Sequence, residues 1–176
     1  MSASNINPET LSQIGRWSER QRSPHRVEAS EVRRFAQAVM DDSPRTWRDE
    51  SVPGRAFDGP VAPPAFAVHA FRRAPGTADP LERLAREPSF DGVGLDLRDN
   101  LPALGIRLPR LLNGGYEHEI YGYFRVGDYI FRRSRYAELF EKQSKSGPMI
   151  FVILEDEYSR EDGDVYLLSR NTLIYR

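Results

Sequence analysis

Few side chains of this chain can carry acid–base chemistry. Cysteine is absent, which removes thiol nucleophiles, thiolate metal sites and disulfides together. The only histidines are His25, His69 and His118, and one pair of adjacent carboxylates, Asp41 and Asp42, follows an apolar periodic segment. A histidine paired with a carboxylate is a common arrangement for general acid–base catalysis. Catalysis by this chain therefore depends on which histidine the fold brings to a carboxylate.

The three histidines have different sequence surroundings. His25 lies in a polar stretch, which indicates a surface position, and His69 follows apolar residues in an expected buried helix, which indicates a core position. His118 lies between Glu117 and Glu119 in a strand-like segment, which favours a cross-strand or interface role, and it is the alternative candidate for a base. Neighbours on a strand point to opposite faces and no further ligands have suitable spacing, so we expect no metal site.

The carboxylate pair follows the strongest helical pattern of the chain. Ser30 is the expected N-cap. Pro44 disfavours a helical conformation of Ser43 and so ends the helix. At this end of a helix a carboxylate gains nothing from the helix dipole; Asp41 either caps the next turn or is a remnant of a catalytic site. The apolar residues that recur at the spacing of one helical face are Val32, Phe35, Ala36, Val39 and Met40.

The remaining pattern predicts a short helix and then a sheet. The second helix is expected to open at Val61-Ala62-Pro63-Pro64, because proline is accepted in a first helical turn. Residues 74–112 are rich in Pro, Gly and charge, and we interpret them as an insertion. The four apolar and aromatic segments that follow predict an antiparallel meander, with Asp162-Gly163 as a hairpin turn. They are Gly115–Arg125, Asp128–Gln143, Met149–Arg160 and Val165–Arg176.

Apolar residues occupy both alternating faces of the last two of these segments. We therefore expect a helix to cover one face of the sheet and another chain to cover the other. Arg132, Arg133 and Arg135 alternate between the two faces of their strand, which indicates salt bridges on a sheet face rather than one basic surface.

Composition excludes several classes of protein. The chain has 176 residues, enough for one sizeable domain, with 25 basic and 26 acidic side chains and a formal charge of -1. This balance provides no field that would attract nucleic acid or an anionic membrane. No segment approaches the roughly 20 apolar residues of a membrane span, and the first thirty residues contain no apolar signal-peptide core. We expect a cytoplasmic protein without a nucleic-acid or membrane partner.

Five short motifs, in order, resemble the N-terminal half of MaoC-like dehydratases. The resemblance covers residues 27–176 as one domain, interrupted at about 74–112, and leaves residues 1–26 as an N-terminal arm. It implies an α+β hot-dog fold, in which an antiparallel sheet wraps around a central helix. It also implies acyl-CoA or acyl-carrier thioesters as substrates, with water added across a 2,3-double bond or removed. The motifs are the segment from Val27-Glu28 to Ser43-Pro44, Val61-Ala-Pro-Pro-Ala-Phe66, Leu112-Asn-Gly-Gly115, Arg125-Val-Gly-Asp128 and Arg170-Asn-Thr-Leu-Ile-Tyr-Arg176.

The catalytic motif of the resembled family is incomplete in this chain. Its pattern is close to Asp-x-Asn-Pro-x-His, and here Asp41 matches the acid while Thr46 stands where histidine is expected. Neither Thr46 nor Trp47 can transfer a proton near neutral pH. We therefore expect no catalytic residue in this chain, and a separate catalytic MaoC-like hot-dog subunit that joins it in a heterodimer or heterotetramer.

The resemblance also implies where a substrate binds. We expect the acyl thioester to contact two groups of residues, with coenzyme A as part of the substrate and no resident cofactor. Two alternatives stay open: a homomeric hot-dog thioesterase with Asp41 or Glu117 as its carboxylate, and a scaffold that binds acyl thioesters without turnover. The expected substrate-binding residues are Pro63, Pro64, Phe66, Asn113, Gly114 and Gly115.

Overall fold

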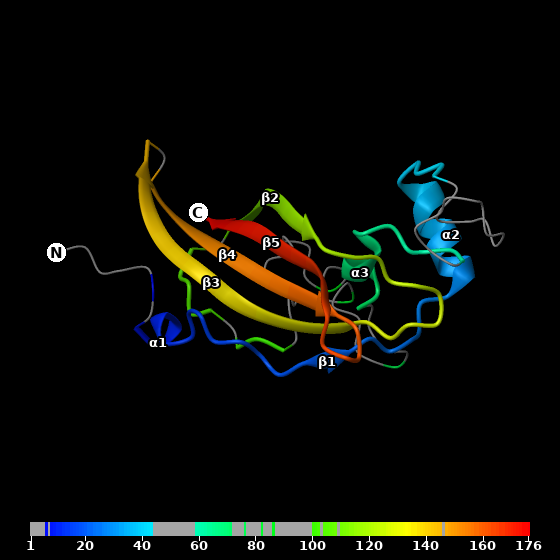
Figure 1. Ribbon diagram of the computed structural model, residues 1–176. Coiled ribbons are helices and arrows are strands. Elements are labelled where there is room, and N and C mark those ends of the chain that lie inside the picture. Colours follow the sequence, from blue (N-terminus) through cyan, green and yellow to red (C-terminus); the bar gives the residue numbers. More distant parts are fainter. Residues whose placement is uncertain are drawn as a thin grey trace.

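The computed structural model describes residues 6, 8–43, 59–71, 76, 82, 86, 100–102, 104–108, 110–145 and 147–176. The strands form one antiparallel sheet in the order β1-β3-β4-β5-β2, and α2 and α3 lie together near one end of this strongly curved sheet (Figure 1). The fold is of the α+β class. The elements within the described residues are α1 Pro8–Leu11, β1 Gln21–Arg22, α2 Ala29–Ala38, α3 Phe66–His69, β2 Leu111–Ile120, β3 Phe131–Ser144, β4 Gly147–Ser159 and β5 Val165–Tyr175.

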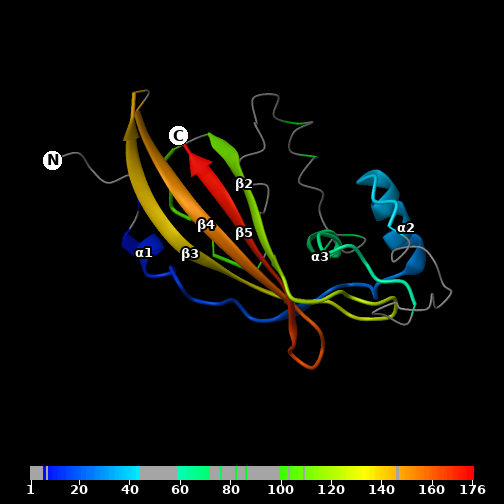
Figure 2. The ribbon, with the colours of Figure 1, turned by 45° about the horizontal axis from the view of Figure 1, so that its top comes forward.

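The meander predicted from the sequence is correct for β3, β4 and β5 and wrong for β2. β2 pairs with β5 and not with β3. The N-terminal segment runs along the other edge of β3 (Figure 2). There the N–H groups of Gly15 and Ser18 donate to the carbonyls of Tyr136 and Ser134, each at 2.8 Å. Because this segment occupies the edge of β3, β2 joins the sheet at its opposite side.

The segments before α3 and after β2 pair with each other, which changes two predicted boundaries. Val61 forms a bridge with Arg125, and the Ala62 N–H donates to the Phe124 carbonyl at 2.8 Å. Val61 is therefore extended, and the helix expected to open there begins at Phe66. The first strand was expected over Gly115–Arg125; it is shifted to Leu111–Ile120 because residues 124 and 125 pair with residues 61 and 62.

The first residues of α2 also differ from the prediction. α2 begins at Ala29, with Glu28 as its N-cap and no side-chain capping bond, so the expected cap at Ser30 is wrong. Val27 is buried, its N–H donates to the Asp128 carbonyl, and its own carbonyl accepts from the Gly127 N–H, both at 2.8 Å. These tertiary bonds fix the path of the chain immediately before Glu28, and the helix follows from it.

Two apolar clusters lie on one face of the sheet, here called the inner face. The first joins α2 and α3 to Tyr158 of β4 and Leu167 of β5. The second is built on Ile150, Val152, Leu154 and Leu173, further along the same two strands. Residues 101, 104, 106 and 108 pack against the second cluster, so this end of the segment that the sequence marked as an insertion contributes to the core.

The arginines of β3 divide between the two faces, as strand alternation predicts. Arg132 is buried on the inner face, with its guanidinium carbon 4.4 Å from the ring centroid of Phe71. Arg133 and Arg135 lie on the opposite face, here called the outer face, 4.6 and 4.4 Å from the ring of Trp17. Trp17 thus fastens the N-terminal segment to the outer face of the sheet by cation–π contacts.

A buried carboxylate joins three strands on the outer face. The Glu155 side chain is only 4% exposed and accepts hydrogen bonds from the Nε atoms of Arg135 and Arg170, each at 2.7 Å. Beside it, Arg133 donates two hydrogen bonds of 2.8 Å to Glu157. Because each pair bridges neighbouring strands, these bonds fix the register of β3, β4 and β5 against slippage.

Replacing Glu155 with Gln should lower the free energy of unfolding by about 2 kcal/mol, because two guanidiniums, each about a third exposed, lose their shared anion. Urea denaturation measures this value. The matched control is Glu138→Gln on the exposed part of β3, where the loss should stay within about 0.5 kcal/mol. Equal losses in the two variants would contradict a structural role for the Glu155 ion pairs.

Candidate functional site

The C-terminus of α2 is closed by a turn that uses the Asp41 carboxylate. The Asp41 N–H donates to the Ala36 carbonyl at 2.8 Å and the Met40 N–H to the Gln37 carbonyl at 3.2 Å, the two bonds of a Schellman motif. Asp41 Oδ1 then accepts the Ser43 N–H at 3.0 Å. The structure therefore shows the capping bond that the sequence allowed for Asp41, while a role as catalytic remnant stays a prediction.

Met40 occupies a strained position in this turn. Its φ is 57°, the only positive φ of a non-glycine residue in the described part of the chain, and the residue is 89% exposed. A side chain in this conformation costs roughly 1 kcal/mol and glycine is the usual residue there. Strain of this kind is typical of functional loops, and here it lies at the start of the incomplete catalytic motif.

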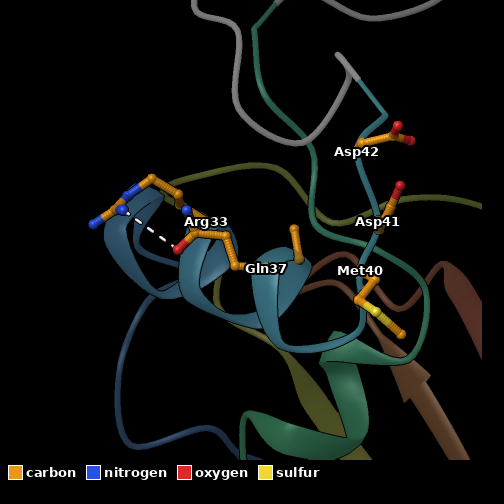
Figure 3. A pocket seen from close by; sticks show the side chains of 6 residues that line it. Arg33, Gln37, Met40, Asp41 and Asp42 are labelled. Atoms are coloured by element: carbon orange, nitrogen blue, oxygen red, sulfur yellow. Dashed lines mark hydrogen bonds between the residues drawn. The ribbon is translucent and has the colours of Figure 1, made fainter.

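An open cavity of about 620 Å³ lies beside the same turn (Figure 3). Arg33 and Gln37 of α2 border it on one side, with the Arg33 Nη1 3.5 Å from the Gln37 Oε1, while Asp41 and Asp42 extend beyond the helix end. Its described lining therefore offers one cation and two carboxylates, and no histidine. The described residues that line it are Arg33, Ala36, Gln37, Met40, Asp41 and Asp42. Thr46 and Trp47, on which the sequence argument also rests, lie outside the described residues.

The first group of expected substrate-binding residues is part of the core. Pro63 and Phe66 are buried and Pro64 is half-buried. The Phe66 ring packs edge-on against Phe35 at 5.6 Å between centroids, and it lies in the cluster that contains Leu167. The Pro-Pro pair thus ends in a turn that places Phe66 against the inner face.

The second group forms a bulge in β2. The pairing with β5 shifts between Asn113 and Gly115, and Gly115 has a φ of 121°. Asn113 Oδ1 accepts from the Gly115 N–H and from the Nδ2 of buried Asn171, both at 2.9 Å. A Cβ on Gly114 would lie 2.8 Å from Thr172 Cγ2. The sequence Asn-Gly-Gly therefore lets the backbone of β2 approach β5 closely.

The structure places the two groups far apart along the inner face. Phe66 belongs to the cluster of Leu167, whereas Asn113 pairs with Leu173, six residues further along β5. At 3.3 Å per residue this separation is about 20 Å. The β5 positions beside the two groups are therefore well separated, and a molecule that reached both groups would have to be elongated.

The three histidines lie in different parts of the fold. His25 is exposed, as predicted, and His69 is half-buried, with its ring 5.4 Å from that of Phe35. His118 is exposed on β2, and its ring stacks on Tyr116 at 5.9 Å. Among the described residues, no three His, Asp or Glu side chains gather in a way that could hold a metal ion.

Sequence reasoning missed a polar row that crosses the inner face. Ser134, Asp156 and Ser169 are buried neighbours on β3, β4 and β5, and His118 is the next residue in register on β2. Ser134 Oγ donates to Asp156 Oδ1 at 2.6 Å. This row separates the two apolar clusters. Its only sequence signal is a polar residue at a strand position where the alternation calls for an apolar one.

Comparison with known proteins gives the relationships of this chain. A family model described as "FAS1-like, dehydratase domain region" matches residues 12–167. A comparison with curated protein sequences finds no significant match. In the described part of the chain, no helix has the length and apolar character needed to cross a membrane.

Several solved structures are similar to this chain in fold. The ChsH1-ChsH2 complex from Mycobacterium tuberculosis has a chain with a TM-score of 0.68 and 17% identity, covering 95% of this chain and 89% of that one. A MaoC-like dehydratase from Rhodospirillum rubrum has a TM-score of 0.55 and 21% identity, with 90% of each chain covered. The HadBC (3R-hydroxyacyl-ACP dehydratase) complex from M. tuberculosis has a TM-score of 0.57 and 18% identity, covering 89% and 95%.

Gly114→Ala should destabilise the protein by about 1–3 kcal/mol, because the new Cβ would collide with Thr172 across the bulge. Thermal unfolding measures the change. Adding Thr172→Ser removes the Cγ2 that lies 2.8 Å away and should restore part of the loss. If the double variant is no more stable than Gly114→Ala, close packing at the bulge is not the reason for glycine at this position.

Proposed function

The chain belongs to the FAS1-like dehydratase region family, of the MaoC-like hot-dog type, and from this premise we propose that it is a non-catalytic subunit of a heteromeric enoyl-thioester hydratase or dehydratase. In this proposal a partner hot-dog subunit supplies the Asp/His pair. This chain contributes one wall of the acyl-thioester site. The enzyme acts in the cytoplasm on an acyl-CoA, and coenzyme A enters only as part of the substrate.

The proposal rests mainly on the hydrogen bond that the Asp41 carboxylate makes at the end of α2. Hydration of an enoyl thioester needs a base for water and an acid for the α-carbon, close together. In this chain the carboxylate at the matching position caps a turn through the Ser43 N–H, and the sequence has Thr46 where the family motif has histidine. A capping carboxylate without a histidine cannot perform both proton transfers, so the pair must come from another subunit.

The difference between the two edges of the sheet is evidence in favour of a partner subunit. The N-terminal segment covers the edge of β3, but no strand among the described residues pairs with the outer edge of β2. Tyr116 and Ile120, on the inner face of that strand, are 52% and 49% exposed. An open strand edge with exposed apolar side chains is a site for pairing with another chain. ChsH1-ChsH2 and HadBC are themselves complexes of two components.

The layout of the inner face favours an elongated substrate. It has two apolar clusters, one beside Phe66 and one opposite the β2 bulge, separated by about 20 Å along β5. The clusters and the polar row are buried within this chain, so a long acyl thioester would contact the exposed inner-face side chains of β2 beside them, Tyr116 and Ile120. At Gly115 a Cβ would meet nothing within 4 Å, so the backbone of the bulge is open to a ligand there.

The homomeric thioesterase is less well supported by the same contacts. Of its two candidate carboxylates, Asp41 is engaged by a backbone N–H, and Glu117 lies on the outer face, opposite the apolar clusters. Neither is placed to activate a water beside an acyl chain on the inner face.

The purified chain alone should hydrate short enoyl-CoA esters no faster than buffer, and activity should appear when a MaoC-like subunit with an intact Asp/His motif is added. Within that active complex, Asp41→Asn in this chain should change kcat by less than about tenfold, whereas loss of a true general base costs about 10²–10⁴-fold. A spectrophotometric assay at the enoyl-thioester absorbance measures both. The matched control is Asp42→Asn.

Turnover by the chain alone would contradict the division of roles. A thousandfold loss in the Asp41→Asn complex, with folding and assembly intact, would return Asp41 to the catalytic residues. A stable homo-oligomer that hydrolyses acyl-CoA instead would favour the thioesterase.

A further inference from the structure

The outer face of the sheet carries a row of charged side chains that ends at the open edge. Arg170 bridges Glu155 and Glu119, with its Nε 2.7 Å from Glu155 Oε2 and its Nη1 2.5 Å from Glu119 Oε1. Glu119 also accepts the Tyr121 hydroxyl at 2.6 Å. The hydrogen bond from Tyr121 and that from Arg170 lower the pKa of Glu119, so this carboxylate stays ionised under mildly acidic conditions.

The row contains one more negative than positive charge, and the excess lies on the edge strand. Three arginines, Arg133, Arg135 and Arg170, face four glutamates on the same face. Glu155, Glu157 and Glu119 each contact an arginine. The fourth is Glu117, which is exposed on β2 and opposite Arg170 in the register, while the Arg170 guanidinium is directed to Glu155 and Glu119.

Pairing of β2 with a second copy of itself would place these carboxylates against each other. The part of β2 beyond the bulge is Gly115–Ile120, and antiparallel self-pairing must be centred on Glu117 or His118 to use it fully. Centred on Glu117, Glu117 faces its own copy. Centred on His118, Glu117 faces Glu119 of the second copy, twice. Directly opposed side chains are about 5 Å apart, and like charges at that distance oppose pairing.

We infer that the edge of β2 rejects a second copy of this chain and selects a partner strand with basic side chains opposite Glu117 and Glu119. This inference rests on the proposed function, because it names what distinguishes the catalytic partner from a homodimer. The apolar inner-face side chains Tyr116 and Ile120 supply attraction for any hot-dog strand. The outer-face charges decide which strand is accepted.

Self-association of the purified chain tests whether the β2 edge rejects a second copy. Sedimentation velocity of the purified chain should show weak dimers that become tighter in about 1 M salt, where the Debye length falls to about 3 Å and the like charges are screened. Glu117→Gln should tighten dimerisation about tenfold at low salt, because one substitution removes two symmetry-related repulsions in the His118 register and the single one in the Glu117 register. The matched control, Glu138→Gln, removes an equal charge from β3 and should leave dimerisation unchanged.

Charge reversal identifies the register. Glu117→Lys should dimerise more tightly than wild type by itself if pairing is centred on His118, because each lysine then faces Glu119. If pairing is centred on Glu117, it should instead associate with wild-type chain in an equimolar mixture. In either case the gain should disappear in high salt. Circular dichroism of each variant confirms that the sheet is intact.

Two results would overturn the inference. One is a tight wild-type homodimer whose dissociation constant changes neither with salt nor with Glu117→Gln. The other is Glu117→Lys associating no better than wild type, alone or mixed. These outcomes are separate from failure of the proposed function, which is measured as turnover by the single chain.

Discussion

An antiparallel sheet has two outer strands, and the backbone groups on the outer side of each need a partner or protection. In this protein one edge of the sheet is covered by the chain itself, and the other edge is open among the described residues. The N-terminal segment lies along β3, held by backbone bonds from Gly15 and Ser18 and by the stacking of Trp17 on two arginines. β2 has no such cover among the described residues, and its side chains are largely exposed. An uncovered edge strand of this kind is open to pairing with another chain, and the proposed partner rests on this asymmetry.

The inner face of the sheet contains both apolar clusters of the core. α2 and α3 cover one end of it, and the segment 101–108 covers the other. Between the two apolar clusters lies the buried row of Ser134, Asp156 and Ser169. In the proposed role the subunit contributes the shape and polarity of one wall of the acyl site, and the Asp41 carboxylate in the turn after α2 accepts the Ser43 N–H.

The sequence was informative wherever a local pattern determines the structure. β3, β4 and β5 match their predicted segments closely because the alternation and the turns that define them lie within a few residues, as at Gly163 between β4 and β5. The capping role of Asp41 is equally local, since the Ser43 N–H is two residues away. The division of the β3 arginines between two faces follows from strand geometry alone.

The wrong predictions concern elements whose pairing or boundary depends on contacts between residues far apart in the sequence. The pairing of β2 with β5 depends on the N-terminal segment having taken the edge of β3, which no pattern within β2 reveals. The start of α2 depends on bonds from Val27 to residues 127 and 128, and the start of α3 on the bridge from Val61 to Arg125. The shared role of the two groups of the expected site stays a prediction; the β5 positions beside them, Leu167 and Leu173, are about 20 Å apart along the strand.

The central claim is that β2 is completed by another subunit. Hydrogen–deuterium exchange tests it most directly, on the chain alone and on the same chain in the assembly isolated from its natural source. The account predicts that the amides of residues 115–120 exchange rapidly in the isolated chain and become strongly protected in the assembly, while those at the β3 edge near Ser134 are protected in both. Rapid exchange along β2 in the intact assembly would contradict it.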